Sequence, residues 1–212
     1  MDGNNRWSKK KNISKYKSYK KGAEKLIEIT NFIFSNYDIN YVSAFALSKH
    51  NFKRGTVLIN IIKNVLLDFL EPSKNSNNFK YKVLFKGNLN FLPTKIVEGL
   101  KKLQKNNSKS KKKLVIYLNY SGKEDITNSL KSLFHSNKTN YRKLDNYLTS
   151  AGIPDPDILI RTGGFQRISD FMLYQISFTE LFFTTKLWPS ISNKDITKFI
   201  EKYNKIDRKF GN

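Results

Sequence analysis

The sequence predicts an α/β fold, in which a central, mainly parallel β-sheet is flanked by helices. Short runs of β-branched and aromatic residues alternate along the chain with segments of helical periodicity, a pattern typical of α/β domains. The length of 212 residues and the 39% hydrophobic content suit one globular domain with its own core. Neither an internal repeat nor a long linker interrupts the sequence, so we expect a single domain over 1–212.

The predicted strands are short apolar runs bounded by polar or turn-forming residues. "KLVIYLNY" and "DILIR" are the clearest, because β-branched residues are enriched in both. Between the runs, "EPSKNSNN" (71–78) and the lysine-rich stretch 106–113 have the composition of solvated loops. We expect strands at 40–47, 80–86, 113–120, 157–161 and 180–184.

The predicted helices follow from apolar residues that recur three and four positions apart. For the last of them, Ser192 and Asp195 form the pattern of a capping box. For the segment that begins "DFML", Ser169 is the expected N-cap. We expect helices at 20–36, 56–70, 94–105, 124–135, 141–150, 170–177 and 193–205.

The helix at 56–70 is apolar over more of its circumference than one core contact needs. The residues with core spacing are Leu58, Ile61, Ile62, Val65, Leu66, Phe69 and Leu70. The apolar face is widened by Val57, Ile59 and Leu67. Two interpretations stay open: an ordinary buried helix, or a helix that also lines a hydrophobic cavity.

The net charge of +22 raises the question of nucleic-acid binding. No RNA-binding or helix-turn-helix signature accompanies the charge, and lysine is spread over the whole chain. We therefore expect no nucleic-acid partner, but a transient contact with anionic membrane surfaces. The absence of cysteine fits a reducing compartment, so we expect a cytoplasmic location, peripheral at the inner membrane surface.

Arginine is rare in this chain, at 6 residues against 33 lysines. Four arginines, Arg6, Arg54, Arg161 and Arg167, lie in stretches rich in turn-forming or hydrogen-bonding residues. Lysine supplies positive charge equally well, so arginine at these places indicates a need for the planar, forked donor that grips phosphate or carboxylate.

The stretch "DILIRTGGFQRISDFML" combines two arginines with a Gly-Gly turn and an expected helix start. A helix N-terminus beside Arg161 and Arg167 would hold a diphosphate. Glu180 supplies a carboxylate at the next strand. The alternative is that the arginines are surface residues paired with Asp157 and Asp170.

Two further polar stretches have the composition of sites. "MDGNNRW" offers the Asp2 carboxylate for Mg²⁺ and a small turn for phosphate, although an ordinary turn has the same composition. "ALSKHNFKR" follows a predicted strand, where α/β proteins bind ligands. His50 and His135 have neither triad nor metal-ligand spacing.

Taken together, "MDGNNRW", "FALSKHNFKR" and "DPDILIRTGGFQRISDFMLYQISFTELFFTTKLWP" resemble the cis-prenyltransferase family, in particular its undecaprenyl diphosphate synthases (isoprenyl transferases). The resemblance spans nearly the whole chain. It implies an α/β fold with a hydrophobic product tunnel bordered by the 56–70 helix, a homodimer, and Mg²⁺ as cofactor. It also implies condensation of isopentenyl diphosphate onto an allylic diphosphate such as farnesyl diphosphate, giving a precursor of an undecaprenyl-type carrier lipid.

The resemblance also implies residue roles. Asp2 matches the magnesium-linked catalytic aspartate, Asn51 the position of proton acceptance, and Glu180 the second metal ligand. Arg161, Arg167 and Ser169 match the clamp on isopentenyl diphosphate. The full set of expected substrate-binding residues is Gly3, Asn4, Asn5, Arg6, Trp7, Lys15, Tyr19, Ser48, Lys49, His50, Phe52, Arg54, Arg161, Arg167, Ile168 and Ser169.

Several positions depart from the family pattern. Asn5 replaces a glycine, and Phe165 stands where a glutamate normally follows the Gly-Gly pair. Other departures are Lys15, Tyr19, Lys49, His50, Phe52 and Gln166. Because the family has an apolar strand before the aspartate, we expect such a strand upstream of Met1. The alternative to an active enzyme is a non-catalytic or decayed subunit of the same family.

Overall fold

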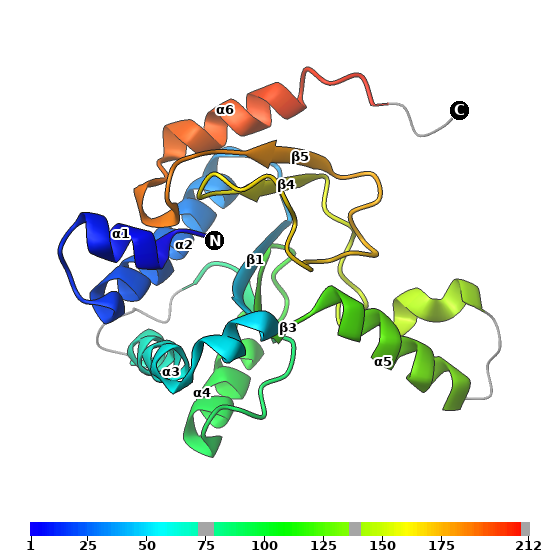
Figure 1. Cartoon of the computed structure of the whole chain (residues 1–212). Helices are drawn as coiled ribbons and strands as arrows, with labels where there is room; N and C mark the ends of the chain where they lie inside the picture. Colours follow the sequence, from blue (N-terminus) through cyan, green and yellow to red (C-terminus); the bar gives the residue numbers. More distant parts are fainter. Residues whose placement is uncertain (72–78, 136–140, 209–212) are drawn as a thin grey trace. The chain divides into compact units, whose positions relative to one another are not determined.

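The computed structural model describes residues 1–71, 79–135 and 141–208 (Figure 1). Its contacts group the chain into two compact units. Unit 1 consists of Met1–Ile39, Asp155–Ile168 and Gln175–Asn212, and unit 2 consists of Asn40–Pro154 and Ser169–Tyr174. The prediction of one domain over 1–212 stays a prediction, and the predicted loop at 71–78 lies almost wholly outside the described residues.

Unit 2 contains a parallel sheet in the order β1 (Tyr41–Ser48), β3 (Lys113–Tyr120), β2 (Lys82–Lys86). Tyr41 and Lys82 both lie opposite Lys113, so the two outer strands begin level with the central one. β3 is buried along most of its length, as expected of a strand covered on both faces. This explains why "KLVIYLNY" is a nearly continuous apolar run rather than an alternating one.

The other elements of unit 2 are the 3₁₀ helix η1 (Lys49–Arg54), the α-helices α3 (Thr56–Leu70), α4 (Thr94–Lys105) and α5 (Gly122–His135), and the 3₁₀ helix η2 (Tyr141–Asn146). α3 packs against α4, and α4 packs against β2. On α3 the buried residues are Ile62, Val65, Leu66 and Phe69. Phe69 stacks on Phe79 with ring centroids 5.7 Å apart. The predicted core face is thus confirmed for these four residues, whereas Leu58, Ile61 and Leu70 are half-buried.

Unit 1 contains α1 (Asn4–Lys10), α2 (Lys15–Asn36), the parallel pair β4 (Ile158–Arg161) and β5 (Glu180–Phe183), the 3₁₀ helix η3 (Trp188–Ser190) and α6 (Asn193–Tyr203). Trp188 is buried, and its indole Nε1 donates to the Gly22 carbonyl of α2 at 2.8 Å. Gly22 allows this close packing, because a Cβ there would meet Trp188 and Asn4. α6 begins with the predicted capping box of Ser192 and Asp195.

The α/β class with parallel strands is confirmed, and the predictions for 56–70, 94–105 and 113–120 match the structure residue for residue. Strand pairing forms a three-stranded and a two-stranded sheet. The prediction of a helix at 141–150 is wrong beyond Asn146, since η2 is a 3₁₀ helix followed by turns. α1 was not predicted, and α2 begins five residues before the predicted helix at 20–36.

The prediction of a helix at 170–177, with Ser169 as its N-cap, is wrong. Ser169, Asp170 and Met172 have φ values of 51°, 67° and 49°. Such left-handed residues cannot belong to a right-handed α-helix, and the segment forms turns instead. Packing explains this conformation, because Phe171 stacks on Phe45 with ring centroids 4.5 Å apart.

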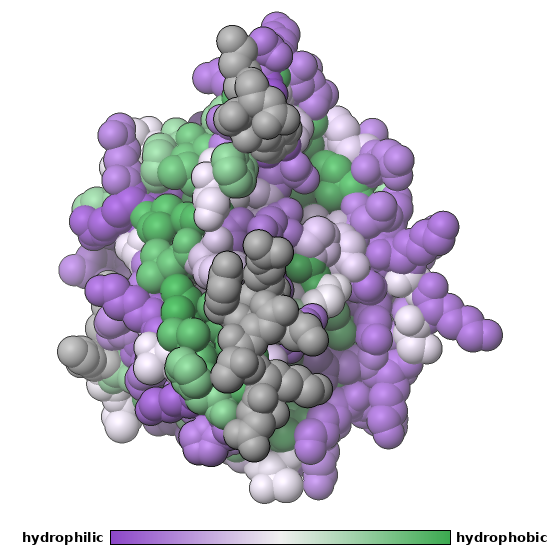
Figure 2. Space-filling view, turned by 90° about the vertical axis from the view of Figure 1, so that its right-hand side faces the viewer, coloured by the Kyte–Doolittle hydropathy of each residue, from purple (hydrophilic) through white to green (hydrophobic). Residues whose placement is uncertain are grey.

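Within the described ranges, none of the helices is both long enough and apolar enough to cross a membrane. The face drawn in Figure 2 shows hydrophilic residues with apolar side chains among them. The large apolar side chains most exposed to solvent include Val57, Phe134 and Phe178.

Candidate active site

The backbone of Asp2 is fixed at the end of β4. Its N–H donates to Thr162 Oγ1 at 2.9 Å, and the Thr162 hydroxyl donates to the Asp2 carbonyl at 2.9 Å. The backbone N–H of Trp188 donates to the same carbonyl, also at 2.9 Å. Thr162 is only 1% exposed. Three hydrogen bonds to residues distant in sequence therefore position the candidate catalytic carboxylate.

The Asp2 carboxylate lies between two arginines. Arg161 Nη2 is 3.1 Å from Asp2 Oδ2, and Arg6 Nη2 is 3.5 Å from Asp2 Oδ1. The Arg161 side chain is 13% exposed, whereas those of Asp2 and Arg6 are 36% and 45% exposed. One carboxylate cannot neutralise two guanidinium groups, so this cluster keeps a positive charge on a face that solvent reaches.

The turn after β4 brings a second polypeptide segment to the same cluster. Gly163 and Gly164 have φ values of 89° and 84°, which glycine adopts without steric cost. Their N–H groups donate to the carbonyls of Lys186 and Thr184, each at 2.8 Å. A Cβ on Gly163 would lie 2.4 Å from Arg6 Nη2 and 3.3 Å from Asp2 Cβ. The glycine thus makes room for the Asp2–Arg6 pair.

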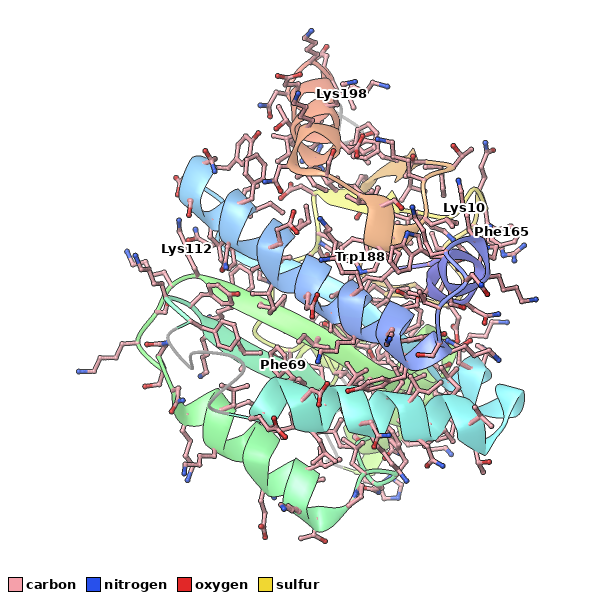
Figure 3. The ribbon with its side chains drawn as sticks, turned by 90° about the vertical axis from the view of Figure 1, so that its left-hand side faces the viewer. Lys10, Phe69, Lys112, Phe165, Trp188 and Lys198 are labelled. Carbon is pink, nitrogen blue, oxygen red and sulfur yellow. The ribbon has the colours of Figure 1, made fainter. Side chains whose placement is uncertain are left out.

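Arg167 and Phe165 complete the cluster in unit 1. The Arg161 Nη1 group donates to the Arg167 carbonyl. The Phe165 ring has the Arg167 guanidinium 4.2 Å from its centroid, with Arg6 and Arg161 at 5.1 Å and 5.6 Å. Figure 3 shows Phe165 beside α1. The structure therefore brings Asp2, Arg6, Arg161 and Arg167 together, as the diphosphate hypothesis requires.

The other residues predicted in the first turn have partners within unit 1. Gly3 is the N-cap of α1 in a left-handed conformation and lies against Leu187. The Asn4 side chain points towards Gly22 of α2, and Trp7 Nε1 donates to Ser190 Oγ at 2.9 Å. Lys15 and Tyr19 lie in the first turns of α2, and Asn5 is exposed on α1.

The second predicted segment lies in unit 2 at the carboxyl end of β1. Ser48 ends the strand, and Lys49 forms an ion pair with Glu124 of α5. Asn51 and Phe52 are half-buried in η1, and the Phe52 ring contacts the Phe91 ring edge to face with centroids 5.0 Å apart. Arg54 is the last residue of η1, and its side chain lies outside the described part of the structure.

His50 is tied to the turn that follows Ser169. Its Nε2 lies 3.0 Å from Asp170 Oδ2, which also accepts a 2.6 Å bond from Ser121 Oγ. Burial raises the pKa of Asp170, but the bonds from Ser121, the Lys123 N–H and His50 outweigh it and hold that pKa below its usual range. His50 thus links η1 to the turn at Asp170.

The alternative in which the arginines pair with Asp157 and Asp170 is wrong. Arg161 pairs with Asp2, Asp157 pairs with Arg208 at 2.8 Å, and Asp170 contacts His50. The predicted helix start beside the arginines is also absent from the described chain, because residues 169–178 form turns. Ile168 is half-buried and Ser169 is exposed. Positive charge around Arg161 and Arg167 therefore comes from their guanidinium groups rather than from the predicted helix at 170–177.

The candidate magnesium ligands are the carboxylates of Asp2 and Glu180. Among the described residues there is no group of three or more His, Asp or Glu side chains that would form a complete metal cage. Mg²⁺, however, is commonly held by one or two carboxylates together with substrate phosphates. The part-exposed Asp2 carboxylate fits that role, and Glu180 is half-buried at the start of β5.

Sequence reasoning missed three contributors to the cluster. Thr162 anchors Asp2, Gly163 admits Arg6, and Phe165 contacts three arginines. The signal in the sequence was the Gly-Gly turn itself together with Phe165, which stands where the family pattern has a glutamate.

Comparison with known proteins identifies the family of the chain. A family model described as "Putative undecaprenyl diphosphate synthase" matches residues 1–211. The isoprenyl transferase of Wolinella succinogenes is 32% identical over 216 residues, covering 100% of this chain and 93% of its own length. The Pyrobaculum aerophilum tritrans,polycis-undecaprenyl-diphosphate synthase (geranylgeranyl-diphosphate specific) is 34% identical over 222 residues, covering 99% and 92%.

Two solved structures share the fold. Lavandulyl diphosphate synthase from Lavandula x intermedia, in complex with dimethylallyl diphosphate, superposes with a TM-score of 0.87 at 24% identity, covering 100% of this chain and 95% of that one. A probable undecaprenyl diphosphate synthase from Campylobacter jejuni gives a TM-score of 0.76 at 22% identity, covering 91% and 92%. By the family model and these relatives, the chain belongs to the undecaprenyl diphosphate synthase family of cis-prenyltransferases.

Proposed function

We propose that this prenyltransferase condenses isopentenyl diphosphate onto an allylic diphosphate such as farnesyl diphosphate. The product is a cis-polyprenyl diphosphate of the undecaprenyl type, the precursor of a carrier lipid. The observation that carries the proposal is the convergence of Arg6 and Arg161 on the anchored carboxylate of Asp2. Family membership supports the reaction class, and the undecaprenyl product named for the Pyrobaculum relative supports the product class.

The arginines act on the leaving group. When the allylic C–O bond breaks, its electron pair stays on the diphosphate, and the negative charge there increases. Guanidinium groups already held in place stabilise that charge without reorganising. Arg6 is assigned to the allylic diphosphate, and Arg161 and Arg167 to isopentenyl diphosphate. Fixing both diphosphates directs the double bond of isopentenyl diphosphate towards the allylic carbon.

A proton must leave the condensed product, and Asn51 is assigned to its acceptance, as the family resemblance implies. Ser48 and Ser169 belong to the same assignment as substrate-binding residues. Position supports Ser48 and Asn51, because Ser48 ends β1 and Asn51 follows it in η1, at the strand end where α/β sheets bind ligands.

Mg²⁺ is proposed as the cofactor, with Asp2 as its principal ligand and Glu180 as the second. A bound Mg²⁺ would neutralise charge on the leaving diphosphate. Arg6 and Arg161 already occupy the neighbourhood of the Asp2 carboxylate, and their charge opposes binding of a free cation. Asp2 should therefore hold the metal together with a diphosphate rather than alone.

The growing prenyl chain needs an apolar tunnel, and α3 is proposed as one wall. Leu58, Ile59 and Ile61 are half-buried on this helix, outside the set that packs fully in the core.

We further propose a homodimer in the cytoplasm with peripheral contact at the inner membrane surface. Exposed apolar residues such as Phe178 and Leu181 support association, and the net charge of +22 supports attraction to anionic lipid.

Incubation of the protein with radiolabelled isopentenyl diphosphate, farnesyl diphosphate and Mg²⁺, followed by product sizing, tests the proposal. Parallel reactions with geranylgeranyl diphosphate identify the preferred starter. Extracted polyprenyl products that depend on Mg²⁺ and on Asp2 are expected. If the folded protein forms no polyprenyl product with any allylic starter, the alternative of a non-catalytic subunit is favoured. The retained Asp2 site argues against that alternative.

A further inference from the structure

The ring of Phe165 is shared by three arginines that come from three parts of unit 1. Arg6 lies in α1, Arg161 ends β4, and Arg167 follows the Gly-Gly turn. Their guanidinium carbons lie 5.1 Å, 5.6 Å and 4.2 Å from the ring centroid. All three distances fall within the range of about 6 Å over which an aromatic ring attracts a cation.

Three guanidinium groups repel one another, so their convergence requires an attractive interaction that offsets the repulsion. Asp2 is an ion-pair partner of Arg6 and Arg161. The Phe165 ring attracts all three through the negative potential of its face. A carboxylate at this place would neutralise part of the charge, whereas an uncharged ring orients the arginines and leaves their charge for a ligand.

The backbone on either side of the ring is restrained. The N–H groups of Gly163 and Gly164 are bonded to the carbonyls of Lys186 and Thr184, and Arg161 bonds the Arg167 carbonyl. Phe165 is nevertheless 41% exposed. Its apolar burial therefore explains little of its placement, and contact with the arginines accounts for it better.

We propose that Phe165 is a positioning residue, whose ring holds Arg6, Arg161 and Arg167 in the arrangement that binds diphosphate. The inference rests on the proposed function, in which these arginines are the diphosphate ligands. Since Arg6 is assigned to the allylic substrate and the other two to isopentenyl diphosphate, Phe165 supports both sites at once. Loss of the ring should weaken the binding of both diphosphate substrates together.

Direct binding of inorganic pyrophosphate, measured by calorimetry with and without Mg²⁺, tests the inference apart from turnover. Phe165→Leu keeps an apolar side chain but removes the ring, and we expect binding to weaken on the order of 10-fold. Phe165→Trp, with a stronger ring potential, should restore binding to within about 3-fold of the original. Phe134→Leu, a matched change at an exposed phenylalanine of α5, should leave binding unchanged.

Steady-state kinetics supply the second measurement. Phe165→Leu should raise the KM of both diphosphate substrates and also lower kcat, because Arg6 stabilises the charge that develops on the leaving diphosphate. A rise for one substrate alone would overturn the shared role. Circular dichroism and the melting temperature of each variant show whether the fold is intact.

Fluorination separates the potential of the ring from its size. Replacing Phe165 by fluorinated phenylalanines weakens the face potential in steps with little change in shape. Pyrophosphate affinity should fall with each added fluorine. If the protein with pentafluorophenylalanine in place of Phe165 binds pyrophosphate as tightly as the original protein, the ring acts by packing and the inference is wrong. If the unmodified protein fails to bind pyrophosphate, the proposed function fails first, so the two failures are distinguishable.

Discussion

Arg161 Nη2 donates to Asp2 Oδ2 at 3.1 Å, across 159 positions of sequence. The same guanidinium also donates through Nη1 to the Arg167 carbonyl and approaches the Phe165 ring. One planar group thus connects the candidate metal-linked carboxylate, the turn and the ring. Its side chain is 13% exposed, whereas Asp2 and Phe165 are 36% and 41% exposed, so a largely buried arginine makes these contacts at the edge of solvent.

The first prediction is that Arg161→Lys weakens use of isopentenyl diphosphate although the charge is kept. A lysine ammonium cannot reach Asp2 and the Arg167 carbonyl from one plane, nor grip a phosphate with two parallel bonds. Losing one charge-assisted bond of about 1.5–3 kcal/mol predicts a KM roughly 10- to 100-fold higher. Initial rates against isopentenyl diphosphate concentration measure this, and unchanged kinetics would count against the clamp.

The second prediction is that Asp2→Ala abolishes turnover while leaving the fold intact. The anchoring bonds to Thr162 and Trp188 use the Asp2 backbone, which alanine retains. Removing the carboxylate also removes the anionic side chain that competes with a bound anion for Arg6 and Arg161. Pyrophosphate should therefore bind the variant at least as tightly as the original protein when Mg²⁺ is absent. Added Mg²⁺ should raise the affinity for pyrophosphate less in the variant than in the original protein.

Turnover assays and calorimetry with magnesium titration measure both effects. Asp2→Asn is the matched control for size, and it should behave like the alanine variant. A variant that keeps most of its activity would place the metal at other residues.

The elements that sequence predicted well have strong local patterns. The helices at 56–70 and 94–105 bury residues that recur three and four positions apart, and the strand at 113–120 buries most of a continuous apolar run. α1 lacks such a pattern, because "NNRWSKK" has a single aromatic and no aliphatic residue. Its stability comes from packing on α2 and η3, which no local signal conveys.

At residues 169–178, in contrast, the sequence predicted a helix that the structure does not form. "DFMLYQIS" has helical spacing, but the side chains find better partners elsewhere. Phe171 stacks on Phe45, and Asp170 accepts bonds from Ser121 and the Lys123 N–H. These tertiary contacts hold left-handed residues that an isolated peptide would avoid.

For the site, sequence indicated the charged residues but not their geometry. Asp2, Arg6, Arg161 and Arg167 were candidates because aspartate and arginine suit metal and diphosphate chemistry. That Arg161 meets Asp2, and that Phe165 lies among three arginines, depends on how β4 and α1 pack. A pair separated by 159 positions leaves no pattern in one sequence.

The third prediction concerns the capping box of α6. Burial raises the pKa of Asp195, but bonds from Lys186 and Ser192 outweigh it and lower that pKa to about 2. An unfolded aspartate titrates near about 3.9, so the folded state gains stability above that pH. The gain is lost as pH falls towards 2.

Asp195→Asn removes this titration, and should cost about 1 kcal/mol at neutral pH. Melting temperatures of both proteins between pH 7 and pH 3 should converge on the acid side. Lys186→Met removes the 2.6 Å ion pair but keeps the capping box, so it should retain part of the pH dependence. A constant difference between Asp195→Asn and the original protein at every pH would show that the carboxylate charge contributes nothing.

The fourth prediction uses two adjacent glycines as a matched pair. Gly163 and Gly164 have nearly the same positive φ, 89° and 84°, so alanine at either position incurs a similar backbone strain of about 1–3 kcal/mol. Their surroundings differ. A Cβ on Gly163 would lie 2.4 Å from Arg6 Nη2, whereas one on Gly164 would meet its nearest atoms, in Thr185, at 3.8 Å and beyond.

Both alanine variants should therefore lose similar stability, but only Gly163→Ala should displace Arg6 from Asp2. Because the atom nearest the new Cβ is at the far end of the flexible Arg6 side chain, the extra cost falls on the site rather than on the fold. A displacement of about 1 Å at catalytic groups can reduce the rate on the order of 100-fold. Melting temperatures and kcat/KM for farnesyl diphosphate separate the two effects. Equal activity losses in the two variants would mean that backbone strain alone is responsible, and that the closeness of Gly163 to Arg6 has no part in the reaction.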